Sequence, residues 1–422
     1  MEQRWLAEYA WLGSERLESR VLITATGGVF TGVSPNSEDR TAQRIQGVAL
    51  PGLVNSHSHA FHRSLRGRTH SQGGDFWEWR DLMYELVGDL NPETYEDLAT
   101  QVYREMAEAG ITVVGEFHYL HHQPGGSPYA DRNEMGHALI RAARNSGIRI
   151  ALLDAGYLRS GFNDDSLNPV QQRFSDGTVD AWLDRFVELS LAYKDESDVR
   201  IGIAPHSVRA LSPEDLARVA DFRNSATRTH IHVSEQPSEN ADCVLATGVT
   251  PVGLLDRAGL LGPTTTAVHA THLTSKDIGL LGDSHTGVCY CATTERDLAD
   301  GLGPSGDLHA AGAKLSVGSD SHAMIDLFEE ARGIELHNRL ATGHRGAFSP
   351  GSLLEAATVN GAETLGFESA GIEVGSPADL IAVSTTSWRT RGFEPTDGVG
   401  QLVFAATSSD VTDVFVAGKR IV

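Results

Sequence analysis

Two closely spaced histidines in the first third of the chain are the clearest chemical signal in this sequence. His57 and His59 lie two residues apart in "LVNSHSH", after a run that begins like a buried strand. Side chains at positions i and i+2 of a strand share one face, so both imidazoles point the same way, as two ligands of one metal ion must. The stretch therefore predicts the first half of a metal site.

Further ligand candidates end two later strand-like stretches. In "THIHVSEQ", His232 lies nearer the carboxyl end than His230, so His232 is the predicted ligand and His230 is expected to pack lower in the core. Asp320 closes "SVGSDSH". Three histidines and one aspartate suit Zn²⁺, with Fe²⁺ as second choice, provided that water or substrate takes a further position.

Two acid–base candidates accompany these ligands. Glu235 follows His232 by three residues, just past the predicted strand end. A carboxylate beside a metal-bound water, but not itself a ligand, can shuttle its proton. His269, at the end of "TAVHATHL", is a second base candidate, whereas His272 is expected in the following loop or against a helix.

Each of these residues also has a simpler interpretation. A lone histidine on an apolar strand is usually a hydrogen-bonded core residue, and Asp320 alone would be interpreted as a helix N-cap. The simpler interpretations fail together, because the candidates follow one another at four strand ends, and clustered ligands outrank single motifs. The core interpretation is preferred for six other histidines: His118, His137, His285, His309, His337 and His344.

The three cysteines give no comparable signal. Cys289 and Cys291 are separated by one residue, unlike the CxxC spacing of zinc ribbons and redox motifs, and are interpreted as small residues of a buried strand end. An odd and sparse set also argues against a disulfide framework.

The elements that must position these side chains alternate along the chain. Eight short stretches begin apolar, and almost all end in His, Glu, Asp or Ser: "GLVNSHSH", "GITVVGEFHY", "RIALLDAGY", "RIGIAPHS", "THIHVSE", "TAVHATHL", "TGVCYCA" and "KLSVGSDSH". Helical patterns between them cover 92–109, 133–146, 176–194, 212–224, 250–260, 326–342 and 350–363. The alternation predicts an α/β fold, a (β/α)8 TIM-type barrel with its chemistry at the carboxyl ends of the strands.

Both ends of the chain read as short strands punctuated by glycine and serine. Residues 1–48 plus 374–422 are predicted to form a small composite β-sandwich domain. The barrel is then expected to take residues 49–373.

Composition excludes several partners. The net charge of −22, from 34 Lys+Arg against 56 Asp+Glu, repels nucleic acid and anionic membranes, so neither partner is expected. The first 20 residues contain acids and no continuous apolar segment, and no run of about 18 apolar residues occurs. A reducing, cytoplasmic compartment is the expectation.

The motifs "HSH", "HIHVSE", "HATH" and "GSDSH", framed by a split β-rich domain, resemble the amidohydrolase superfamily over essentially the whole chain. The spacing of His232 and Glu235 is typical of its deaminase branch. The resemblance implies one metal ion, bound by residues of strands 1, 5 and 8, because "RIGIAPHSVRAL" lacks the strand-4 lysine of binuclear branches. It also implies a homodimer.

Within that branch, "HSHAFHRSLRGR", "FWEWRDLMYEL", "GEFHYLHH", "APHSVRAL" and "DLFEEARGIELHNRL" resemble the deiminases of histidine degradation. The implied reaction hydrolyses N-formimino-L-glutamate to N-formyl-L-glutamate and ammonia. A substrate with two carboxylates needs cations, and Arg209 after strand 4 and Arg80 after strand 1 could each clasp one in bidentate fashion. Tyr119 and His206 could add hydrogen bonds, although surface arginines and a packed tyrosine are the simpler interpretations.

One residue departs from the pattern of these deiminases. That pattern has glutamine after "HSHAF", where this chain has His62. Histidine reproduces only part of the donor and acceptor capacity of glutamine, depending on its tautomer. A preference shifted towards a related N-formimino or N-guanidino acid is therefore an open alternative.

The predicted catalytic residues are Glu235, His269 and Asp320. Asp320 and His269 would take the proton of the attacking water, and Glu235 would protonate the departing nitrogen. Three other hypotheses remain: a nucleobase or amine deaminase, an amide hydrolase acting on N-acyl amino acids, and a non-catalytic binding protein. The spacing of Glu235 argues against the second, and the complete ligand set argues against the third.

Overall fold

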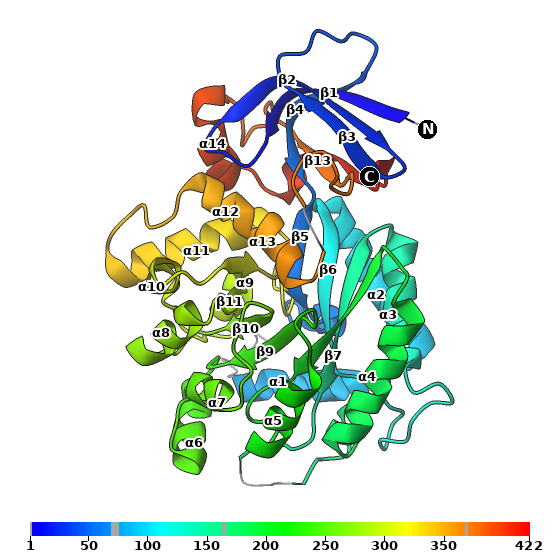
Figure 1. Cartoon of the computed structure of the whole chain (residues 1–422), viewed down its shortest axis with the longest axis vertical. Coiled ribbons are helices and arrows are strands. Elements are labelled where there is room, and N and C mark those ends of the chain that lie inside the picture. The colour runs from blue at the N-terminus through cyan, green and yellow to red at the C-terminus, as the bar shows by residue number, and fades with distance from the viewer. Residues whose placement is uncertain (1, 69–75, 163–165, 368–369) are drawn as a thin grey trace.

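The computed structural model describes residues 2–68, 76–162, 166–367 and 370–422 and contains two sheets (Figure 1). The larger sheet has eight strands, and each pairs in parallel with the next one along the chain. The strands are β5 (Leu53–Ser58), β6 (Ile111–His118), β7 (Arg149–Gly156), β8 (Val199–Pro205), β9 (Thr229–Val233), β10 (Thr265–His269), β11 (Gly287–Tyr290) and β12 (Leu315–Val317). All eight stretches predicted as barrel strands are confirmed.

The carboxyl ends of the first and last barrel strands are joined directly. The amide of Asp320 donates to the His57 carbonyl at 3.0 Å, and the amide of His59 donates to the Asp320 carbonyl at 3.1 Å. This closure brings the "HSH" and "GSDSH" motifs together, although they are far apart in the sequence. The predicted (β/α)8 TIM-type architecture is confirmed.

Helices cover the outside of this sheet (Figure 1). They are α1 (Phe76–Gly88), α2 (Pro92–Glu108), α3 (Glu134–Ser146), α4 (Val179–Tyr193), α5 (Pro213–Phe222), α6 (Pro237–Thr247), α7 (Pro251–Arg257), α8 (Ser275–Asp283), α9 (Ala292–Asp297), α10 (Ser305–Ala310), α11 (Leu327–Thr342), α12 (Pro350–Ala356) and α13 (Val359–Thr364). Strands β5, β6 and β7 are buried along their whole length, as expected of parallel strands covered on both faces.

One predicted helix, over 350–363, is two helices in the structure. Helix α12 ends before Ala357, and Thr358, with φ −136° and ψ −98°, precedes α13. The hydroxyl of Thr358 donates to the Leu354 carbonyl at 2.6 Å, a carbonyl at the end of α12 that also accepts from the Ala357 amide at 3.1 Å. The apolar periodicity continues across this break, so the sequence pattern did not reveal it.

The second sheet joins the two ends of the chain, and Figure 1 shows both termini in this upper lobe. Its strands form one mixed sheet in the order β15-β14-β13-β4-β1-β2-β3, in which β13 pairs antiparallel with β4. Helix α14 (Gly398–Ala405) belongs to the same end of the chain. The strands are β1 (Glu2–Trp11), β2 (Leu17–Thr26), β3 (Val29–Ser34), β4 (Gln43–Pro51), β13 (Leu380–Val383), β14 (Val411–Val416) and β15 (Lys419–Arg420).

The separate terminal sheet is confirmed, whereas the domain boundaries at 48/49 and 373/374 stay a prediction. Strand β4 runs on to Pro51, and β5 begins only two residues later. The β-domain has its own core, in which the rings of Trp5 and Phe415 lie 5.3 Å apart.

A buried ion pair ties the two sheets together. Arg149, the first residue of β7, contacts Asp379 just before β13, with Nε–Oδ2 and Nη2–Oδ1 distances of 2.8 and 3.2 Å. Asp379 also accepts a hydrogen bond from the amide of Ala417 at 2.7 Å. One carboxylate thus connects the amino-terminal side of the barrel with β13 and the turn after β14.

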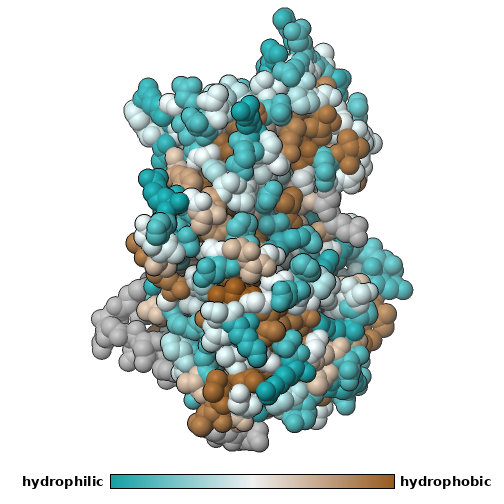
Figure 2. All heavy atoms as spheres, turned by 60° about the vertical axis from the view of Figure 1, so that its left-hand side comes forward, coloured by the Kyte–Doolittle hydropathy of each residue, from teal (hydrophilic) through white to brown (hydrophobic). Residues whose placement is uncertain are grey.

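The molecular surface alternates in polarity. On the face drawn in Figure 2, apolar patches are separated by hydrophilic side chains. Within the described residues, none of the helices has both the length and the apolar character that a membrane crossing needs.

Candidate active site

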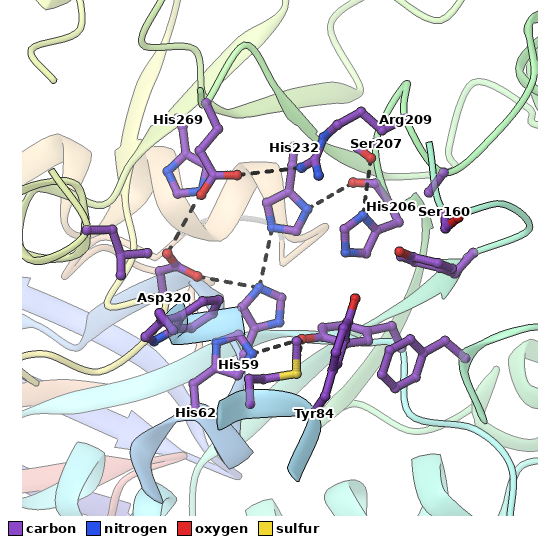
Figure 3. A pocket seen from close by; sticks show the side chains of 18 residues that line it. His59, His62, Tyr84, Ser160, His206, Ser207, Arg209, His232, His269 and Asp320 are labelled. Atoms are coloured by element: carbon purple, nitrogen blue, oxygen red, sulfur yellow. Dashed lines mark hydrogen bonds and ion pairs between the residues drawn. The ribbon is translucent and has the colours of Figure 1, made fainter. Parts of the chain in front are cut away.

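Four predicted ligands converge at the carboxyl ends of the barrel strands, and Figure 3 labels three of them, His59, His232 and Asp320. The Nε2 atom of His232 lies 3.1 Å from Nε2 of His57 and 3.3 Å from Nε2 of His59. Oδ1 of Asp320 is 3.4 Å from both of those partner nitrogens, His57 Nε2 and His59 Nε2. Four residues from three strand ends therefore aim one atom each at a common point.

The spacing and chemistry of these atoms fit a single metal ion. Zinc bonds of about 2.0–2.1 Å at tetrahedral angles separate ligand atoms by roughly 3.3 Å. Burial lowers the pKa of His57, His59 and His232, which favours the neutral imidazole that a metal requires. Burial by itself raises the pKa of Asp320, but the hydrogen bond from His57 and the nearby histidine charges outweigh it, so the pKa lies well below its usual range.

Backbone carbonyls fix the orientation of two of these histidines. Nδ1 of His59 lies 3.0 Å from the Phe117 carbonyl, and Nδ1 of His232 lies 2.9 Å from the His206 carbonyl. A carbonyl can only accept, so Nδ1 carries the proton in both rings and Nε2 is left with its lone pair towards the common point.

A buried glutamate on β6 supports the "HSH" turn from behind. Glu116 accepts hydrogen bonds from the Ser58 hydroxyl and the Ala60 amide, both at 2.6 Å. Burial raises the pKa of Glu116 to about 8. These bonds hold the backbone on either side of His59. The sequence feature that could have indicated this role of Glu116 is the presence of an acid in the otherwise apolar stretch "GITVVGEF".

The two predicted acid–base residues face each other beside the ligands. Nε2 of His269 is 3.7 Å from Oε1 of Glu235 and 3.9 Å from Oδ2 of Asp320. The backbone is left-handed at three positions of the site, with φ of +54° at Ser234, +68° at His269 and +43° at Asp320. Such conformations are costly for residues with a side chain and persist where surrounding contacts impose them, often at active sites.

The sequence pattern missed a second carboxylate behind His269. Oε1 of Glu295, in α9, is 3.5 Å from Nδ1 of His269 and accepts a hydrogen bond from the Cys291 amide at 3.0 Å. Burial by itself lowers the pKa of His269, but the negative charge of Glu235 and the bond to Glu295 raise it well above its usual value. The sequence feature that could have indicated Glu295 is its place as a glutamate in the first turn of a helix, where a negative charge is favourable.

A pocket with an empty volume of about 750 Å³, its mouth included, opens over this cluster. Its lining combines aromatic and apolar side chains with polar groups and three of the predicted ligands, His59, His232 and Asp320. The aromatic and apolar residues include Trp79, Met83, Tyr84, Tyr119, Tyr157 and Phe174, and the polar residues include Ser160, His206, Ser207, Arg209 and Glu235.

The predicted substrate-binding residues fall into two groups. Arg209, Tyr119, His206 and His62 all line the pocket. Arg80 lies in α1, but its side chain is outside the described part of the structure. Its predicted contact therefore stays a prediction.

Arg209 stands between two carboxylates at the pocket wall. Its Nη2 atom is 3.8 Å from Oε2 of Glu235, and its Nε atom is 3.6 Å from Oε2 of Glu239. The side chain keeps a quarter of its surface exposed. A guanidinium is thus presented to the same pocket as the ligand cluster.

His62 is held against the pocket tyrosine. Its Nε2 atom is 2.8 Å from the hydroxyl of Tyr119, and its ring centroid lies 4.5 Å from that of His59. Burial lowers the pKa of His62 to about 3, so the ring is neutral near pH 7.

The histidines predicted as core residues lie outside the ligand cluster, but the core prediction is wrong for His285, His309 and His344, which are exposed. Nε2 of His230 lies 3.0 Å from the Thr364 carbonyl, below the site as expected. Nε2 of His118 lies 3.2 Å from Nδ1 of His121. Cys289 and Cys291 are buried, and Cys291 borders the site, because its sulfur lies within 4.8 Å of ligand atoms of His269 and Asp320.

The barrel, the terminal sheet and this donor cluster agree with the comparison of the sequence with family models. Residues 48–421 match the Amidohydrolase family, and the chain belongs to that family. It is a hydrolase acting on C–N bonds, a deaminase of this superfamily with a small-molecule substrate.

Several relatives are named deaminases or deiminases. The chain is 33% identical to formimidoylglutamate deiminase of Pseudomonas aeruginosa, covering 100% of this chain and 93% of that protein. It is 27% identical to 5-methylthioadenosine/S-adenosylhomocysteine deaminase of Natronomonas pharaonis, over 94% of this chain and 86% of that protein.

Solved structures give the same picture. An amidohydrolase from Brucella melitensis superposes with a TM-score of 0.92 at 29% identity, covering 99% of this chain and 94% of that one. An adenosine deaminase from Xanthomonas campestris with bound zinc gives 0.85 at 25% identity, covering 99% and 92%.

Proposed function

We propose that this protein hydrolyses N-formimino-L-glutamate to N-formyl-L-glutamate and ammonia, as in histidine degradation. The observation that carries the proposal is the Arg209 guanidinium, which lines the same pocket as the ligand cluster and lies 3.8 Å from Glu235. A cation beside the proton-transfer residue suits an amidine substrate that carries carboxylates. The similarity to the Pseudomonas formimidoylglutamate deiminase supports the same substrate.

The proposal includes one zinc ion per subunit, with Fe²⁺ as the second choice. His57, His59, His232 and Asp320 would hold it, since their ligand atoms have the spacing and charge that such an ion requires. When bound, such an ion lowers the pKa of a water molecule towards neutrality. The zinc in the Xanthomonas relative supports this choice of metal.

The side chains of the site carry out the proton transfers of the reaction. Asp320 and His269 take the proton of the water that attacks the formimino carbon. The amidine of the substrate enters as its cation, so one proton from Glu235 completes the ammonia that leaves when its bond to that carbon breaks. The hydroxyl that came from water returns its remaining proton to Glu235 as it becomes the new formyl carbonyl, and the amide nitrogen of the glutamate is retained.

The same proposal assigns the substrate contacts. Arg209 and Arg80 each hold one carboxylate, and Tyr119 and His206 donate hydrogen bonds within the pocket. His62, already bonded to Tyr119, lies beside this group and bears on the choice between N-formimino-L-glutamate and its analogues.

A second candidate, deamination of a nucleobase, is favoured by the aromatic side chains that line the pocket. Tyr84, Tyr119, Tyr157 and Phe174 could stack against a flat ring. The same arginine that supports a dicarboxylate has no partner in an uncharged base, and this difference separates the two hypotheses.

The test is ammonia release by zinc-loaded protein from a panel of substrates: N-formimino-L-glutamate, N-formimino-L-aspartate, N-guanidino-L-glutamate, guanine and adenosine. We expect the highest kcat/KM with N-formimino-L-glutamate. No turnover of this compound, or a preference for either purine compound, would contradict the proposal. Light scattering on the same sample tests the predicted homodimer.

A further inference from the structure

We infer that Glu239 is a positioning residue that holds both the proton-transfer group Glu235 and the substrate arginine Arg209. This inference rests on the proposed function, because it explains how the two groups come to share one wall of the pocket. Glu239 lies in the first turn of α6, and its side chain is 1% exposed. It does not line the pocket, so it acts through its neighbours.

One oxygen of Glu239 holds the backbone that carries Glu235. Oε1 accepts a hydrogen bond from the Ser234 amide at 3.2 Å, and the amide of Glu235 also donates to this carboxylate. Ser234 has a φ of +54°, a conformation that needs support from its surroundings. The carboxylate therefore stabilises the turn between β9 and α6 at the residue where the catalytic side chain leaves the barrel.

The other oxygen of Glu239 faces Arg209. The Oε2–Nε distance is 3.6 Å, and in the described structure neither atom has a hydrogen bond of its own. The attraction between these charges is strong because the carboxylate is buried. It holds the Nε side of the guanidinium at the wall and leaves the terminal nitrogens available for a carboxylate of the substrate.

Glu239 also balances the pull of Glu235 on the same arginine. The two carboxylates approach different nitrogens of Arg209 at similar distances, 3.6 and 3.8 Å. Without Glu239, the attraction of Glu235 would draw the guanidinium towards the proton-transfer group and away from its substrate position. A shift of this kind costs roughly tenfold to a hundredfold in reaction efficiency.

Two substitutions separate the two contacts. Glu239→Gln keeps an oxygen for the amides of Ser234 and Glu235 but removes the charge facing Arg209. We expect its KM for N-formimino-L-glutamate to rise at least tenfold with kcat changed less than fivefold. Glu239→Ala also removes the acceptor of the turn, so its kcat should fall at least tenfold as well.

The matched control is Asp242→Asn, which removes an exposed carboxylate from the same helix and should leave both constants unchanged. Zinc content should stay at the wild-type level in all three variants. In the double variant Glu239→Gln with Arg209→Gln, KM should equal that of Arg209→Gln alone, because the first change acts only through the arginine.

A wild-type KM in Glu239→Gln, or additive effects in the double variant, would overturn the inference while leaving the proposed function intact. If the wild-type protein itself fails to release ammonia from N-formimino-L-glutamate, the proposed function is wrong. The inference is then decided by hydrogen exchange at the amides of Ser234 and Glu235. Exchange faster in Glu239→Ala than in Glu239→Gln supports it, and equal exchange overturns it.

Discussion

Glu235 stands beside the ligand cluster without joining it, since its contacts are with His269 and Arg209 at 3.7 and 3.8 Å. Glu235→Gln keeps the size of the side chain but removes its capacity to transfer a proton. We expect kcat to fall by about 10²–10⁴-fold. Metal analysis should find the wild-type content, because the substituted group is not a ligand. Near-normal turnover would show that the proton reaches the leaving nitrogen by another route.

At the level of single residues, the sequence predicted the groups that lie on strand ends. His57, His59, His232, His269 and Asp320 could be found because strand alternation and barrel geometry fix where such side chains point. The roles of the supporting glutamates could not be predicted, although acids in an apolar stretch and in the first turn of a helix were visible in the sequence. Glu116, Glu239 and Glu295 bond to backbone amides, and a sequence contains no record of which amide a distant carboxylate will reach.

Among the helices, α1 deserves a test because it carries pocket residues and is held at its end by a buried arginine. Arg173 donates to carbonyls at the end of this helix, with distances of 3.3 Å to Gly88 and 2.5 Å to Leu90, and also to Val87. A cation is favourable at the carboxyl end of a helix, where carbonyls lack partners.

Arg173→Gln should therefore loosen α1, which brings Trp79, Met83 and Tyr84 to the pocket. We expect KM to rise several-fold and the free energy of unfolding to fall by about 1–3 kcal/mol, because buried carbonyls lose their donors. Arg132→Gln, at an exposed ion pair with Glu188, is the control and should change neither KM nor the free energy of unfolding. Equal effects of the two substitutions would refute the anchoring role.

A second element-scale prediction concerns α4, whose Arg185 is fully buried between two carboxylates. Its Nη1 atom is 2.6 Å from Asp154, and its Nε atom is 2.9 Å from Asp176. Burial by itself raises the pKa of Asp176, but the hydrogen bond from His122 and the charge of Arg185 bring the pKa well below its usual range.

Because the folded-state pKa of Asp176 is depressed, its contribution to stability is fully present above the unfolded value of about 3.9 and is lost as pH falls towards the folded value. Asp176→Asn should lower the free energy of unfolding at pH 7 by about 3–5 kcal/mol. The difference from wild type should shrink as pH falls below about 4. Chemical denaturation of both proteins from pH 7 to pH 3 measures the loss at pH 7 and its change with pH. A difference between variant and wild type that does not change with pH would show that the ionised Asp176 does not stabilise the fold.

The elements themselves were largely predictable. Strand limits followed from short apolar runs that end in polar residues, and long helices such as α2 and α11 followed from their periodicity. Helices α1, α6, α8, α9 and α10 were not among the predicted helical stretches. Of these, α6 and α9 start at Pro237 and Ala292 without a side-chain cap, so their limits depend on packing against the barrel. The break between α12 and α13 has the same origin.

For the whole molecule, the ion pair of Arg149 and Asp379 is the connection to test. Asp379→Ala leaves a buried guanidinium without its partner and removes the acceptor of the Ala417 amide. We expect a loss of about 2–4 kcal/mol in the free energy of unfolding, with kcat unchanged, because the pair lies at the opposite end of β7 from the site. Asp413→Ala, at the exposed pair with Arg420, should cost less than about 1 kcal/mol. A fall in the kcat of Asp379→Ala would contradict the claim that this ion pair stabilises the fold without affecting catalysis.

The pairing of β4 with β13 has a consequence for biosynthesis. Strand β4 ends at Pro51, whereas β13 begins at Leu380, about 330 residues later. At about 5–20 residues per second, a ribosome needs roughly 16–66 s to supply the missing partner. During that interval the edge of β4 has unpaired amides and carbonyls that other chains could bind. Nascent chains are thus most vulnerable to aggregation while the barrel is being made, and a premature stop within the barrel leaves this edge permanently open.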